Sequence, residues 1–159
     1  MTDQSAPDWI LQCTAELRDF LGLGDWAITV KMVDGFEDSP STGGRCRYQE
    51  PYRVAIIELA RGRSRAEYIE FIMHELLHVV LSPMDYGAIT AVRLVPKPQR
   101  KVAETLIADG CERAVAPLAK TLIRNVKFDA KYAAVELSEV APEEMPDDDA
   151  PPAPPSPRR

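Results

Sequence analysis

The chain reads YIEFIMHELLHVVL from residue 68 to residue 81, a run in which apolar side chains recur at helical spacing. Ser64 and Glu67 stand immediately before it and are spaced as in a capping box, which predicts that a helix begins here. Pro83 follows the run. Because proline interrupts the backbone hydrogen bonding of a helix, we expect this helix to end before it.

The helix carries the motif HELLH, formed by His74, Glu75 and His78. Residues four apart lie on one face of a helix, so both imidazoles can bind one ion. Zn²⁺ suits them because it is tetrahedral and accepts nitrogen and oxygen ligands, and Glu75 can then act as the general base. The chain has only two histidines, both in the motif, and the helix is otherwise apolar. These facts favour a metal site over a chance match.

A catalytic zinc ion takes three protein ligands, and without another histidine the third must be a carboxylate or a cysteine. We rank Glu104 first, because it lies early in a predicted last helix that can return across the motif. Glu112 projects to nearly the same side two turns later, but an ordinary solvated acid is the stronger expectation for it, and Asp109 is rotated away. Asp85 would give a compact site and ranks below Glu104. Cys111 is expected to be a small core residue.

The rest of the chain predicts a small sheet with helices packed on it. Residues 26–33 and 52–59 are rich in branched or alternating apolar side chains typical of strands, and residues 43–49 form a shorter candidate between them. An amphipathic helix is predicted over residues 10–21, and a long one over residues 99–125. The order of helix, strands, helix and helix indicates the α+β class.

Composition limits what the motif can mean. With 159 residues the chain is expected to form one domain, and 19 basic against 25 acidic side chains give no general reason to bind nucleic acid or anionic lipid. No run is apolar enough for a membrane helix, and residues 1–8 lack the features of a secretory signal, so we expect a cytoplasmic protein. Three scattered cysteines argue against a disulfide framework.

The C-terminal segment differs from the rest in composition. Residues 142–159 hold seven of the 14 prolines, five acidic residues and a single large apolar one. Such a segment cannot bury enough apolar surface to offset its ordering entropy, so it is expected to be a disordered acidic tail. The folded domain is therefore expected to span residues 1–141.

Residues 52–109 resemble the zincin-like metallopeptidases encoded by many bacteriophages and prophages. The likeness is carried by HELLHVVLSP at residues 74–83, followed by VAETL at residues 102–106. It covers about a third of the chain, and HELLH is its one strongly specific motif. The resemblance implies a minimal gluzincin-like fold in which Glu104 completes a zinc site.

Together these observations predict a zinc-dependent metallopeptidase that hydrolyses peptide bonds, with Glu75 as the general base and His74, His78 and Glu104 as metal ligands. The strand over residues 52–59 is expected to offer an edge to which an extended polypeptide substrate adds as a further strand.

Two alternatives remain open. One is a non-catalytic, zinc-stabilised interaction protein that uses the acidic tail for docking. The other is a protease acting on proteins bound to nucleic acid, suggested by a local run of arginines with interleaved tyrosines. The arginines of this run are Arg45, Arg47, Arg53, Arg61, Arg63 and Arg65. An intact Glu75 favours the enzyme over the first alternative, and a solvated surface is the simpler explanation of the arginines.

Overall fold

The computed structural model describes residues 5–126 and shows a mixed α+β arrangement, as the sequence predicts. The helices are α1 (Asp8–Phe20), α2 (Arg65–Val92) and α3 (Lys97–Val126). The strands are β1 (Ala27–Val33), β2 (Gly44–Gln49) and β3 (Val54–Ala60), with a short 3-10 turn, η1 (Glu50–Tyr52), between the last two. The predicted acidic tail and the boundary at residue 141 lie outside the described residues.

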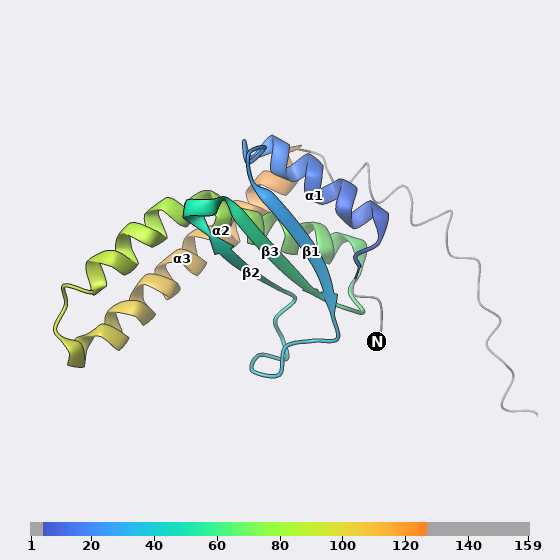
Figure 1. The fold of residues 1–159 in the computed structure, drawn as a ribbon. Helices are drawn as coiled ribbons and strands as arrows, with labels where there is room; N and C mark the ends of the chain where they lie inside the picture. The colour runs from blue at the N-terminus through green and yellow to red at the C-terminus, as the bar shows by residue number, and fades with distance from the viewer. Residues whose placement is uncertain (1–4, 127–159) are drawn as a thin grey trace, which may run out of the picture.

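The three strands form one sheet in the order β1-β3-β2 (Figure 1). β3 pairs in parallel with β1 and antiparallel with β2. The prediction that this third strand is an edge is therefore wrong, because β3 is central and the edges are β1 and β2. Ala55, Ile57 and Leu59 of β3 are fully buried, because they alternate onto the face of the sheet that packs against the helices.

The helix that carries HELLH continues through Pro83 to Val92, so the predicted end before Pro83 is also wrong. A proline inside a helix removes one backbone hydrogen bond, and packing against a neighbouring helix can offset that loss. Ser82 and Val92 are both buried, and α3 runs back along α2. The part of α2 beyond Pro83 thus pairs with α3, and the two helices form a helical hairpin connected by residues 93–96.

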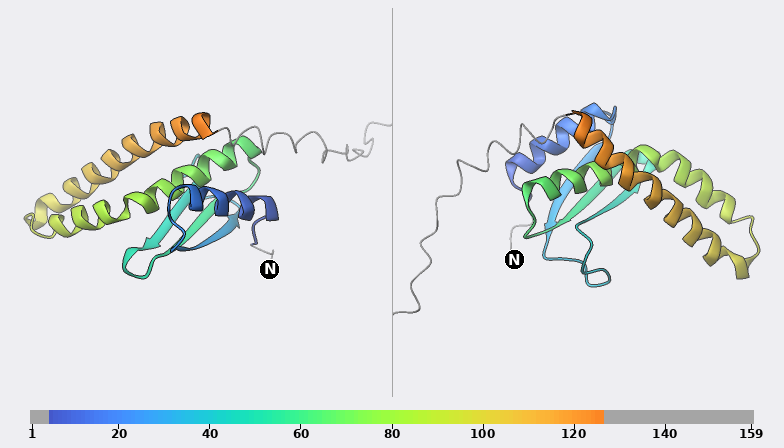
Figure 2. Two further views of the ribbon diagram at one scale, coloured as in Figure 1. Left: turned by 90° about the horizontal axis from the view of Figure 1, so that it is seen from above. Right: turned by 180° about the vertical axis from the view of Figure 1, so that it is seen from behind.

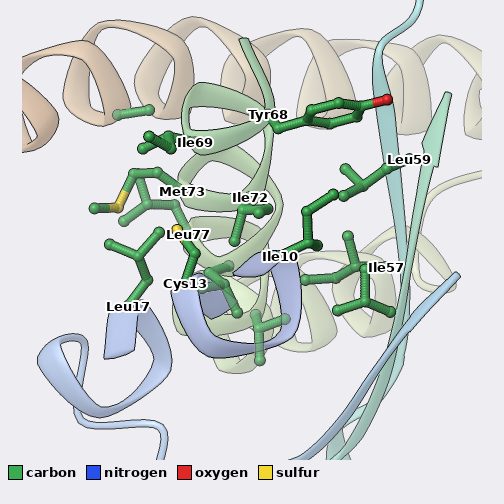
Figure 3. Packing of buried hydrophobic residues seen from close by; sticks show 14 of the residues in the cluster. Ile10, Cys13, Leu17, Ile57, Leu59, Tyr68, Ile69, Ile72, Met73 and Leu77 are labelled. Carbon is green, nitrogen blue, oxygen red and sulfur yellow. The ribbon is translucent and has the colours of Figure 1, made fainter. Parts of the chain in front are cut away.

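Figure 2 shows α2 lying between the sheet and α3, and the far end of the α2–α3 hairpin extending beyond the sheet. The core joins α1, β1, β3, the first half of α2 and the second half of α3, and Figure 3 shows how part of it packs. The residues labelled there are Ile10, Cys13, Leu17, Ile57, Leu59, Tyr68, Ile69, Ile72, Met73 and Leu77. The core therefore anchors the first half of α2, which carries HELLH.

Within the described residues, no helix is long and apolar enough to cross a membrane.

Candidate metal centre

The two histidines of the motif face the same side of α2. Their Nε2 atoms are 3.1 Å apart, and the rings meet edge to face with centroids 4.9 Å apart. Burial lowers the pKa of His78, which favours the neutral imidazole that a metal ion requires. The two imidazoles are thus oriented so that one metal ion could bind both.

Glu112 of α3 meets both histidines. Its Oε2 lies 3.2 Å from Nε2 of His74, and its Oε1 lies 3.2 Å from Nε2 of His78. Ligands held about 2.0–2.1 Å from a tetrahedral zinc ion are roughly 3.3 Å apart, close to all three observed separations. His74, His78 and Glu112, here named the His-His-Glu group, therefore have the donor atoms and the spacing that fit zinc.

Glu104, ranked first from the sequence, lines a cavity that also contains His74 and His78, but its carboxylate is not among the described ligand atoms that converge on the histidines. The reason is the length of the hairpin. His78 lies fourteen residues before the last residue of α2, and Cys111 lies fourteen residues after the first residue of α3. Two antiparallel helices with equal rise therefore bring residues 111 and 112 level with His78. Glu104 lies two turns nearer the connection.

Glu75 is buried between α2 and β2, with 6% of its surface exposed. The backbone N–H of Cys46 donates a hydrogen bond to its carboxylate. Burial, followed by the charge of Glu112, raises the pKa of Glu75 to about 7. Close approach of the strand is possible because Gly44 faces this carboxylate without a side chain. The structure thus places Glu75 beside the histidines, in an apolar and hydrogen-bonded position.

A second group of side chains meets the other face of His78. Nδ1 of His78 lies 3.6 Å from Sγ of Cys111, whose thiol donates to Oδ2 of Asp85 at 3.8 Å. The Tyr48 hydroxyl donates to the same carboxylate oxygen at 2.8 Å. The sequence suggested Asp85 as an alternative ligand of the same ion and Cys111 as a small core residue. Only the pairing of α2 with α3 shows that they meet each other, at a nitrogen of His78 that the His-His-Glu group does not use.

Glu75, the His-His-Glu group and Tyr48 line one cavity of about 690 Å³ between β2, α2 and α3. Asp85 and Cys111 also line it, while Asp109 is exposed and is not among the lining residues. The cavity is large enough for several residues of a polypeptide or for a small molecule.

In comparisons with known proteins, no family model, curated protein or solved structure matches this chain. What the chain does is therefore inferred from the side chains that line this cavity.

Proposed function

We propose that the chain is a zincin-like, zinc-dependent metallopeptidase in which His74, His78 and Glu112 hold the metal and Glu75 is the general base. The observation that carries the proposal is the 3.2 Å approach of each Glu112 oxygen to a different histidine, with a buried carboxylate in the same cavity. Glu112 takes the place that the sequence alone suggested for Glu104.

A zinc ion bound by these residues would supply a Lewis acid that lowers the pKa of a water ligand and polarises a peptide carbonyl. Glu75 moves the proton: its carboxylate takes one from the attacking water and returns it to the leaving amine. A group that both takes and returns a proton works best when its pKa lies near the operating pH. In the metal-free protein burial raises the pKa of Glu75 to about 7, and the charge of a bound cation would favour the carboxylate form that acts as the base. The hydrogen bond from the Cys46 N–H holds the carboxylate in place.

An extended polypeptide is the substrate class that the sheet favours. The Gly43 carbonyl accepts from the Ala60 N–H, so the backbone groups of Gly44, Cys46 and Tyr48 alternate to the other side of β2. Within the described residues β2 pairs only with β3, so an added strand would pair with the backbone groups of the other side apart from the Cys46 N–H, which donates to Glu75. Because Cys46 on this side contacts Glu75, a peptide added there would lie beside the general base.

The arginine run that suggested action on nucleic-acid-bound proteins is largely neutralised in the fold. Four of its members form ion pairs with carboxylates: Arg45 with Asp38, Arg47 with Glu58, Arg53 with Asp25, and Arg61 with Asp34. These pairs reduce the positive field available for phosphates. The remaining alternative, a non-catalytic zinc protein, would have no use for a buried base next to the metal ligands.

The proposal is tested by measuring zinc content and casein hydrolysis on the same samples of the full chain. Glu75→Gln should keep one zinc at the His-His-Glu group and lose hydrolysis by roughly 10²–10⁴-fold, the range for removal of a general base. Glu70→Gln is the matched control, because Glu70 lies on the same helix and pairs with Lys120 instead of lining the cavity. Hydrolysis by Glu75→Gln at the wild-type rate would exclude the mechanism. Stoichiometric zinc without hydrolysis in the wild type would favour the interaction protein.

A further inference from the structure

His78 is shared by two groups of potential metal ligands. Its Nε2 belongs to the His-His-Glu group, and its Nδ1 converges with Oδ2 of Asp85 and Sγ of Cys111, all within 4.8 Å of one another. We name these three residues the His-Asp-Cys group. Because the two ring nitrogens point in different directions, one group does not occupy the position of the other.

The spacing of the His-Asp-Cys group fits a tetrahedral metal ion. With bonds of about 2.3 Å to sulfur and about 2.0 Å to nitrogen or oxygen, the sulfur of a tetrahedral site would lie roughly 3.5–3.6 Å from each of the other two ligand atoms. The observed separations are 3.6 Å from nitrogen to sulfur and 3.8 Å from sulfur to oxygen. A thiolate, an imidazole and a carboxylate together suit zinc and the related ions cobalt and cadmium better than magnesium or calcium.

We propose that His78, Asp85 and Cys111 form a second metal site, selective for zinc-like ions and adjoining the His-His-Glu group through the imidazole of His78. The fourth position of the ion is open to water or to a ligand from the cavity that all three residues line. The site does not depend on peptidase activity, because it needs neither Glu75 nor Glu112.

Metal binding here displaces protons to solvent. Cys111 gives up its thiol proton, and the side chain binds as the thiolate. Asp85 is already held by the hydroxyl of Tyr48, which leaves its carboxylate oriented toward Cys111. When only the second site is filled, His78 remains a neutral imidazole with its proton on Nε2. When both sites are filled, the ring loses that proton as well and bridges the two ions.

Cobalt titration of the chelator-treated full chain, under reducing conditions without oxygen, distinguishes the two sites. The His-His-Glu group has no sulfur, whereas Cys111 should give a thiolate-to-cobalt charge-transfer band in the near ultraviolet. We expect two cobalt ions per chain and a charge-transfer band that accounts for one of them. Cys111→Ala and Asp85→Asn should each reduce the stoichiometry to one, and Cys111→Ala should remove the band.

Two further variants separate this proposal from the proposed function. His74→Ala should lose the first ion and keep the charge-transfer band. Cys46→Ala should keep the band, because Cys46 lines the cavity but its sulfur belongs to neither group of converging ligand atoms among the described residues. Binding of a single ion without a sulfur band would overturn the second site and assign Cys111 to positioning His78. A band that persists in Cys111→Ala would also overturn it. Asp85→Asn gives an independent answer if Cys111→Ala does not fold.

Discussion

Gly44 of β2 lies directly against Glu75 of α2, so close that a β-carbon on Gly44 would stand 3.0 Å from Oε1 and 3.2 Å from Cγ of the glutamate. The absence of a side chain at this one position lets the edge strand approach the proposed base. Gly44→Ala should therefore displace the Glu75 carboxylate while leaving the metal ligands in place. We expect a loss of at least tenfold in casein hydrolysis with unchanged zinc content, since small misplacements of a reacting group are costly.

Gly87→Ala is the control for that change, because a β-carbon at Gly87 would meet nothing within 4 Å. It should leave hydrolysis unchanged. Equal activity of Gly44→Ala and wild type would show that the close approach of β2 does not position Glu75.

Glu112 should be required for zinc binding and Glu104 should not. Glu112→Ala removes the carboxylate that lies 3.2 Å from each histidine, whereas Glu104 lines the cavity farther along α3. We expect Glu112→Ala to lose the zinc of the His-His-Glu group and most of the thermal stabilisation that zinc gives, because a ligand of the folded state stabilises it by mass action. Calorimetry with and without zinc measures both effects. Loss of zinc from Glu104→Ala alone would restore the ligand assignment made from the sequence.

The stability of the metal-free protein should depend on pH through Glu75. Burial raises the pKa of this carboxyl from 4.5 to about 7 in the fold. The neutral form is favoured in the folded state, so its contribution to stability is complete below pH 4.5 and is lost as pH rises through about 7. A pKa shift of this size corresponds to a decrease in the free energy of unfolding on the order of 3 kcal/mol.

Glu75→Gln cannot ionise and should escape this loss. In urea unfolding of the chelator-treated proteins, the variant should gain stability relative to wild type between pH 4.5 and pH 8. The same difference between variant and wild type at both pH values would show that Glu75 is not titrating in this range.

The start of α2 should depend on its capping box. The Ser64 hydroxyl accepts from the Glu67 N–H, and the Ser64 N–H donates to Oε2 of Glu67 at 2.9 Å. Ser64→Ala should lower the free energy of unfolding by about 1 kcal/mol, and Ser64→Thr should restore most of it. Denaturant titration of the three proteins measures the difference, and equal midpoints would mean that the cap does not stabilise the helix.

Gly110→Ala should stabilise the protein. Gly110 lies inside α3, and a β-carbon there would meet nothing within 4 Å. The substitution should raise the free energy of unfolding by about 0.5–1 kcal/mol, because alanine loses less backbone entropy in a helix. Gly22→Ala should have the opposite effect, since Gly22 has a φ of 72° that alanine adopts only with strain. Thermal unfolding of both variants tests whether Gly110→Ala raises the stability and Gly22→Ala lowers it.

The local features of this fold could be predicted from the sequence, whereas its long-range alignment could not. The capping box at Ser64 is confirmed, and the predicted strands correspond to β1, β2 and β3 because each depends on neighbouring residues. The end of α2 depends instead on packing against α3, which offsets the hydrogen bond lost at Pro83.

The misplaced helix end and the preference for Glu104 have one origin. If α2 ended before Pro83, α3 would begin closer to the histidines. Residues in the first turns of α3 would then lie level with His74 and His78. The observed helix runs to Val92, so α3 must pass through two more turns before it reaches His78. The sequence correctly indicated that Glu104 and Glu112 share a face, but their positions along the hairpin required the structure.

The hairpin also determines whether the three ligands of the His-His-Glu group lie close enough to bind one ion. His74 and His78 lie on a helix whose first half is anchored in the core. Glu112 comes from a helix that is joined to it through residues 93–96 and is buried in the same core at Val115, Ala119 and Ile123. Opening the hairpin would leave two imidazoles without their carboxylate. Metal release and local opening of α3 would then be one cooperative event, in which an ion suppresses opening and any opening frees the ion. In such a protein, hydrogen exchange along α3 would report on metal occupancy as directly as a metal assay does.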